Sequence, residues 1–73
     1  MKAVYDEASD TLTVIFRRDP VDESDEIRPG VVADYDREGR LVAIEVLDAS
    51  KQVEDPRNIT VTRESDPSGG GLR

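Results

Sequence analysis

Two runs of residues with β propensity, VVADY and LVAIEVL, flank a short polar turn in the middle of the chain. Stiff branched side chains such as Val31, Val42 and Ile44 suit the pleated surface of a strand. The turn has Asp36 at its first position and Gly39 at its fourth, where glycine supplies the positive φ of a type I turn with a bulge. This stretch predicts a β-hairpin, and it restricts the fold more strongly than any other part of the sequence.

Further strands are expected on the N-terminal side of this hairpin. Residues 2–5 and 11–17 have β character and flank a loop of Asp, Ser and small residues, which predicts a first hairpin. Pro20 ends its second strand because proline has no N–H to donate to a sheet. The charged connector that follows is expected to hold an edge strand near residues 26–28.

The segment after the main hairpin is expected to be helical for one or two turns. Asp48 is a suitable cap for residues 49–54, and Pro56 ends the helix. Residues 58–63 alternate apolar and polar side chains, which is typical of a final strand. The predicted fold is therefore α+β and mostly β, an antiparallel β-meander of two hairpins with a short C-terminal helix.

The chain of 73 residues is long enough for one small domain. We assign residues 1–55 to the β-meander domain with its helix, residues 56–64 to an additional strand, and residues 65–73, rich in Pro, Ser and Gly, to a flexible tail. A single core of this size rarely supplies more than ~3 to 5 kcal/mol of stability. Because the chain has no Cys or His for a disulfide or a zinc site, we expect a homodimer.

The pairing register of the main hairpin predicts where a second copy packs. If Asp36 pairs with Arg40, then Asp34 faces Val42, and both faces of the hairpin are substantially apolar. A half-solvated antiparallel sheet alternates apolar and polar residues, so the second face is expected to be covered by the helix and by another chain. The face predicted to form the dimer interface carries Ala33, Tyr35, Leu41, Ala43 and Leu47.

The formal net charge of −7 restricts the class of partner. Nucleic-acid binding depends on a basic surface that neutralises phosphates, so none is expected for this chain alone. An acidic surface suits a small basic protein partner, a cation or simple solubility, and charge alone does not choose among these. The N-terminus lacks the apolar run of a signal peptide, and no segment approaches the ~20 apolar residues of a membrane span. These features predict a cytoplasmic protein without membrane contact.

Catalysis is not expected from this set of side chains. The chain has neither Cys nor His for nucleophilic chemistry, and its serines fall in predicted loops, caps and tail. With one Phe, two Tyr and no Trp, it has little material to build a pocket that raises the pKa of a carboxyl group. No phosphate-binding loop is present, so we predict a protein without enzymatic activity or cofactor.

Two groups of carboxylates resemble cation sites. Residues 34–45 match much of the calcium-loop pattern, with acids at the first, third and fifth positions, Gly at the sixth and Glu at the twelfth. The flanks are strands rather than helices, and the predicted register places Asp34 and Glu45 on opposite faces, which argues against a shared ion. The alternative is a hard-cation site built from two loops. Its ligands would be Asp6, Asp10, Asp34 and Asp36.

The order and spacing of several short motifs between residues 1 and 53 resemble a small bacterial family, the domain of unknown function 2283. The chain differs from the common pattern in having Ala43 where glycine is frequent, and in extending beyond residue 53. The matching residues are Tyr5, Asp6, Ala8, Asp10, Leu12, Glu23, Ser24, Glu26, Gly30, Val31, Asp34, Tyr35, Asp36, Gly39, the run 43–47, and Ala49, Ser50 and Lys51.

The resemblance implies a compact antiparallel β-meander with a short C-terminal helix and no assigned activity. Some members look like companions of small basic toxin-like proteins, which implies an antitoxin or accessory role as a hypothesis. Charge complementarity and an added edge strand would suit such a partner. The segment predicted to add as a strand is 58–64, with Ile59, Val61 and Arg63 on one side.

Overall fold

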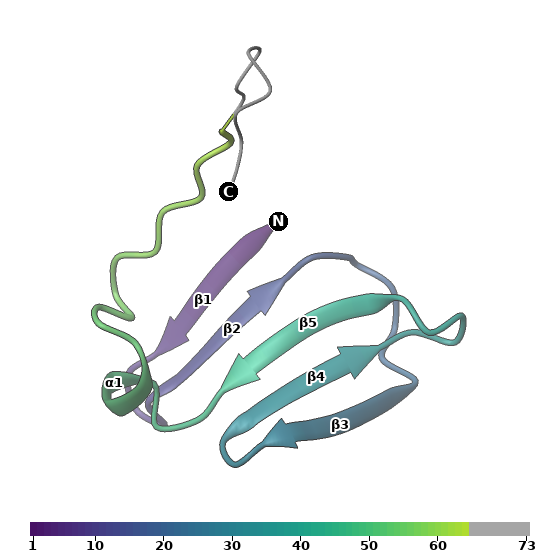
Figure 1. The fold of residues 1–73 in the computed structure, drawn as a ribbon, viewed down its shortest axis with the longest axis horizontal. Coiled ribbons are helices and arrows are strands. Elements are labelled where there is room, and N and C mark those ends of the chain that lie inside the picture. The colour runs from purple at the N-terminus through teal and green to yellow at the C-terminus, as the bar shows by residue number, and fades with distance from the viewer. Residues whose placement is uncertain (65–73) are drawn as a thin grey trace.

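A computed structural model describes residues 1–64 as one antiparallel sheet of five strands with one short helix. This architecture confirms the predicted fold class, which is mostly β with a C-terminal helix (Figure 1). The elements in chain order are β1 (Lys2–Asp6), β2 (Thr11–Ile15), β3 (Glu23–Arg28), β4 (Val31–Tyr35), β5 (Leu41–Val46) and α1 (Ala49–Gln52).

The strand order is β1-β2-β5-β4-β3, so the sheet combines a hairpin with a three-stranded meander (Figure 1). The connector after β2 crosses to the far edge of the sheet, where β3 begins. The chain then returns through β4 to β5, which pairs with β2. This order leaves β1 and β3 as the two edges. The edge strand expected near residues 26–28 is confirmed, and it begins earlier, at Glu23.

The register of the main hairpin differs from the predicted one by a single residue. At the turn, the Asp36 N–H donates to the Arg40 carbonyl at 2.9 Å, as expected. One step further, however, Asp34 lies opposite Ala43 and not Val42. Val42 is the extra residue of a β-bulge, and its carbonyl accepts the N–H groups of both Phe16, at 2.7 Å, and Arg17, at 3.2 Å.

This bulge overturns the predicted dimer face. Because side chains alternate along a strand, a shift of one residue moves every later side chain to the other face. Ala33, Tyr35 and Leu41 lie on one face, whereas Ala43 lies on the opposite face. Leu47 follows β5, where its N–H donates to the carbonyl of Gly30 at 2.8 Å. The five predicted interface residues therefore do not share one surface.

The observed registers define two faces of different character, because residues paired across strands share a face. The polar face combines Thr13, Ser24, Asp34, Ala43 and Glu45 with Val4, Ile15 and Val32. The opposite face, here called the apolar face, carries Ala3, Tyr5, Leu12, Val14, Val31, Ala33, Tyr35, Leu41, Ile44 and Val46.

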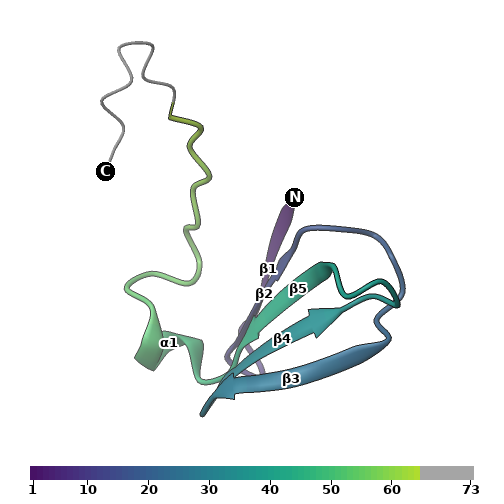
Figure 2. The same cartoon turned by 45° about the vertical axis from the view of Figure 1, so that its right-hand side comes forward.

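Helix α1 and the segment that follows it lie on one side of the sheet (Figure 2). The helix is attached to the loop between β1 and β2, where the Ala49 N–H donates to the Asp10 carbonyl at 2.8 Å and Ala49 is fully buried. The Asp10 carboxylate accepts hydrogen bonds from the Ser50 N–H at 3.0 Å and the Ser50 hydroxyl at 2.7 Å. Asp48 precedes the helix as predicted, but its side chain makes no capping bond. Asp10 caps the helix from a distant part of the chain instead.

Residues 58–64 form no strand, so the additional strand expected there is absent from the structure. The flexible tail expected over residues 65–73 lies outside the described residues. Among residues 1–64, no helix is long and apolar enough to cross a membrane.

The sheet has no second layer over most of its area. Within the described residues, the buried apolar side chains are those of Leu12, Ala33, Val42, Ala43 and Ala49, and no large side chain is completely buried. A folded domain normally places two packed layers of secondary structure around one core. Here the chain supplies one layer and a small part of the second.

Candidate interaction surface

One half of the apolar face is covered by the chain itself. Residues 56–59, here called the covering segment, lie against β1 and β2, where Pro56 is buried and Ile59 lines a small pocket with Tyr5 and Leu12. Arg57 fixes the segment at its edge. Its guanidinium lies over the Tyr5 ring at 5.7 Å from the centroid and pairs with the Glu7 carboxylate at 2.6 Å. Leu12 is consequently only 4% exposed.

No segment among residues 1–64 covers the other half of the apolar face in this way. Around the buried Ala33, it presents half-buried side chains from β2, β5 and β4. We call this surface the open patch. Its residues are Val14, Val31, Ala33, Tyr35, Ile44 and Val46.

The open patch is uncharged, although the chain carries a net charge of −7. Acidic side chains appear only at its border, where Glu23 and Asp25 of β3 lie opposite Tyr35 and Ala33. Contiguous apolar surface rimmed by polar residues marks an interaction site on a soluble protein. The patch can therefore bind another apolar surface, and the acidic residues at its border favour basic groups on the partner beside them.

Edge strand β3 carries uncompensated negative charge. All six of its residues are exposed, and Glu23, Asp25 and Glu26 take part in no ion pair within the described residues. The β4 residues opposite these three acids, Tyr35, Ala33 and Val32, are all neutral. The outer backbone groups of β3 are also free to accept another strand.

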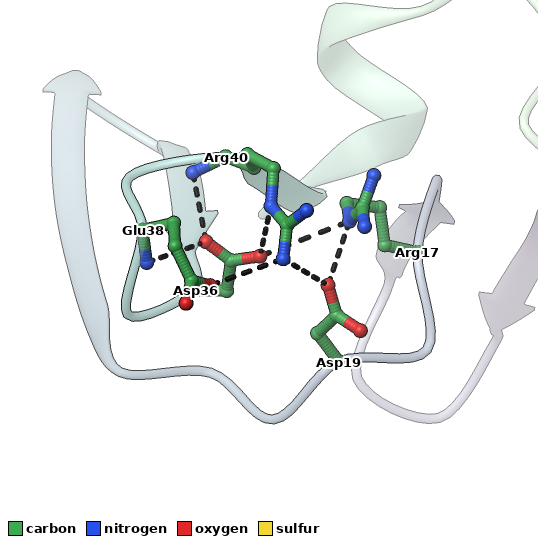
Figure 3. Close-up of polar contacts among 5 residues, drawn as sticks. All are labelled: Arg17, Asp19, Asp36, Glu38 and Arg40. Atoms are coloured by element: carbon green, nitrogen blue, oxygen red, sulfur yellow. Dashed lines mark hydrogen bonds and ion pairs between the residues drawn. The ribbon is translucent and has the colours of Figure 1, made fainter.

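A network of charged groups closes the end of the sheet away from α1 (Figure 3). Its centre is the Asp36 carboxylate, whose side chain is 3% exposed. Asp36 accepts the N–H groups of Glu38, at 3.0 Å, and Arg40, at 2.8 Å, and pairs with the Arg40 guanidinium at 2.9 Å. Asp19 bridges this pair to Arg17, to which it hydrogen-bonds at 2.7 Å.

The electrostatics of this network favour the ionised form of Asp36. Burial by itself raises the pKa of Asp36, but the backbone N–H and the guanidinium of Arg40 outweigh it and lower the pKa to about 2. In the described residues, every buried side-chain nitrogen or oxygen has a hydrogen-bond partner. The network therefore stabilises the turn between β4 and β5.

A second carboxyl pair lies on the polar face. The bulge places Asp34 and Glu45 on the same face, which corrects the expectation that they point to opposite sides. Asp34 is buried and accepts the Ser24 hydroxyl at 2.5 Å. A hydrogen bond with Asp34, together with burial and the Asp34 charge, raises the pKa of Glu45.

The four aspartates of the alternative cation site do not meet. Asp6 accepts the Ala8 N–H at 3.0 Å in the first loop, and Asp10 is committed to Tyr5, at 2.6 Å, and to Ser50. Asp36 and Asp34 lie in the network and in the pair described above. The described residues contain no group of three acidic side chains placed to hold a metal ion.

Sequence reasoning identified the strands that build the open patch but not their common face. Leu12 and Val14 are two residues apart and indicate one apolar face of β2, and their partners Val46 and Ile44 on β5 lie on the same face. The β-bulge at Val42 determines which side chains share a face. No local signal in the sequence marks this residue, because the bulge is held by contacts of the Val42 carbonyl with residues distant in the sequence. The helix expected over residues 49–54 ends earlier, at Gln52, with Val53 as its C-cap, so Pro56 is not the residue that ends it.

Comparison with known proteins gives a family and no annotated relative. Neither the curated proteins nor the solved structures contain a match to this chain. A family model described as protein of unknown function (DUF2283) matches residues 2–50, which span all five strands and the first residues of α1. The match ends before the covering segment. Because it includes well over half of the sequence, the chain belongs to the DUF2283 family.

Proposed function

We propose that this protein is a non-enzymatic protein-interaction module of the cytoplasm that works as a homodimer through the open patch. The observation that carries the proposal is the single-layered sheet, whose apolar face is half covered by its own chain and half open. Burial of apolar surface is the main driving force of folding and association, so a second copy supplies the missing layer. Face-to-face packing of two sheets buries an apolar layer about 10 Å thick.

A second copy suits the patch better than a basic protein does. The patch itself is neutral, and a basic partner would find its counter-charges on β3 and not among these apolar side chains. Two chains of net charge −7 repel each other except where a neutral surface lets them approach. The acidic edge then remains available for a small basic partner, as an antitoxin or accessory subunit would require.

Divalent-cation binding, the rival function, finds no support in the geometry. Its proposed ligands lie at three separate places, and each carboxylate already has hydrogen-bond partners.

The proposal is tested by the mass of the particle in solution. Light scattering and native mass spectrometry of the wild-type chain are expected to give a dimer, and Ile44→Lys, at the centre of the open patch, a folded monomer. Thr13→Lys, on the polar face of the neighbouring strand, is the matched control and is expected to remain dimeric. A monomeric wild-type chain, or a Thr13→Lys variant that dissociates while Ile44→Lys does not, would overturn the proposal.

The same preparation tests the partner class. Native mass spectrometry of the protein isolated from its own cells is expected to show the dimer with a small basic protein bound. Dimer alone at all concentrations would restrict the function to self-association.

A further inference from the structure

Residues 59–63 have the sequence of a strand and pair with no strand in the described part of the chain. Ile59 and Val61 alternate with Thr60 and Thr62, and such a run of branched side chains favours an extended backbone. The segment belongs to no strand or helix, and Val61 is 65% exposed. Figure 1 shows it leaving α1 and running past β1 without joining the sheet. Its backbone groups are therefore available to another sheet edge.

The sheet has a suitable acceptor at its far side. Edge strand β3 pairs with β4 only, and its six residues provide room for five added ones. An exposed strand of this length is a template for strand addition unless it is protected. The register shift between Glu26 and Arg28 interrupts one end of β3, and the stretch from Glu23 to Glu26 stays regular.

The charges of residues 59–63 and of β3, here called the acceptor edge, are of opposite sign. Residues 59–63, the donor segment, include Arg63 and no acidic residue, in a chain of net charge −7. The acceptor edge carries Glu23, Asp25 and Glu26 without ion-pair partners in the described residues. Opposite charges on neighbouring strands stabilise their pairing, and like charges oppose it. Arg63 therefore finds more acidic side chains along β3, which carries Glu23, Asp25 and Glu26, than along β1, which carries Lys2 and Asp6.

The two segments cannot meet within one chain. Ile59 lies against β1 and β2, and four strand spacings of about 4.8 Å place β3 roughly 19 Å from β1. Ile59 leaves this place if it joins an added strand, so the anchor is the buried Pro56. Five extended residues span at most ~18 Å, less than the distance to the outer side of β3, so Val61 cannot pair there within its own chain.

We propose that residues 59–63 of one copy add to β3 of a second copy as a sixth strand. This inference rests on the proposed homodimer, in which two apolar faces pack together. A two-fold axis between them and parallel to the strands exchanges the edges of the sheet, because β5 is its central strand. That rotation places β3 of one copy over β1 of the other, where the donor segment begins. Each copy then gives one strand and receives one.

The absence of native cysteine allows a direct crosslinking test. An isotope-labelled chain with Val61→Cys is mixed with an unlabelled chain carrying Ser24→Cys or Asp25→Cys, which sample both faces of β3. The matched controls on the other edge are Ala3→Cys and Val4→Cys. All these positions except Val61 lie on strands, and each side chain is exposed.

Disulfide-linked pairs of one labelled and one unlabelled chain are expected to form severalfold more with the β3 variants than with the β1 variants. Equal yields, or a preference for β1, would overturn the inference. A wild-type chain that is monomeric by mass would overturn the proposed function as well, whereas a dimer without the β3 crosslink overturns the strand exchange alone. As a second measurement, a chain ending after Arg57 is expected to dimerise more weakly than the full chain. An unchanged dissociation constant would contradict the exchange.

Discussion

The two halves of the apolar face differ in how far the described part of the chain covers them. Over β1 and β2, the covering segment and α1 bury Leu12 and Ala49 within the chain. Over β5 and β4, the neutral side chains around Ala33 remain half-buried, and nothing in the described residues lies over them. The comparison shows that the covered half accounts for the stability of the single chain. The open half is the surface through which we propose that two chains associate.

The largest effect is expected on the covered half, from Leu12→Ala. Removing a buried leucine leaves a cavity and typically costs about 2 to 5 kcal/mol, which is most of the stability of a domain of this size. Urea unfolding followed by circular dichroism would measure it. The loss should appear at every protein concentration, and a loss that vanishes in concentrated solution would show that Leu12 belongs to the interface instead.

On the open half, Tyr35→Ala is expected to weaken association more than folding. A central tyrosine of an interface commonly contributes about 2 kcal/mol, which corresponds to a roughly thirtyfold larger dissociation constant. Analytical ultracentrifugation over a range of concentrations provides the constant, and circular dichroism of the monomer provides the control. If the dissociation constant were unchanged, the patch would not contain the contact.

At the end of the covered half, Asp10→Asn is expected to loosen α1. The substitution removes the charge that accepts the Ser50 N–H and hydroxyl, and with it the cap of the helix. The Asp10 hydrogen bond also raises the pKa of Tyr5, so that pKa should return toward 10.0 in the variant. Ultraviolet-monitored titration of the tyrosines measures the change. A Tyr5 pKa that stays raised would mean that the Asp10 carboxylate is not the group that accepts the Tyr5 hydroxyl and links it to α1.

The smallest effect is expected from pH, and it separates two carboxyl groups that lie outside the open patch. The pKa of Asp36 is lowered to about 2 in the folded chain, so its stabilising contribution is complete above pH 3.8 and is lost as the pH falls toward 2. The pKa of Glu45 is raised, so its contribution is present below pH 4.5 and is lost as the pH rises through the folded value.

Glu45→Gln should therefore raise the melting temperature at neutral pH and lose this advantage below pH 4.5. Asp36→Asn should lower it at neutral pH and flatten its fall below pH 3.8. Thermal melts across this range measure both, with dimer mass as the control. An advantage of Glu45→Gln that is independent of pH would show that the Asp34 pair is not its cause.

The strands, their antiparallel pairing and the short helix could be predicted from the sequence because branched residues, turn glycines and prolines act locally. The grouping of side chains on the two faces could not, because it depends on the bulge at Val42, whose carbonyl accepts the N–H groups of Phe16 and Arg17 just after β2. One residue of register decides whether Ala33 and Ala43 share a surface. The helix cap followed the same rule, since the adjacent Asp48 was predicted and the distant Asp10 performs the capping.

The sequence predicted the type of site, a surface for association, but not the residues that form it. Size, charge and the lack of cysteine and histidine predicted association, and the uncharged half of one face agrees with that expectation. The aspartates that suggested a cation site are each used by the fold, which spacing along the chain cannot reveal.

The most direct test of the central claim is the solvent accessibility of methyl groups, measured by NMR with a paramagnetic cosolute at several protein concentrations. We predict that the methyl groups of Val31, Ile44 and Val46 become protected as the concentration rises, while Leu12 is protected throughout. Those of Ile15, on the polar face, should keep their accessibility. Open-patch methyl groups that remain accessible at every concentration, or polar-face methyl groups that become protected instead, would contradict the account.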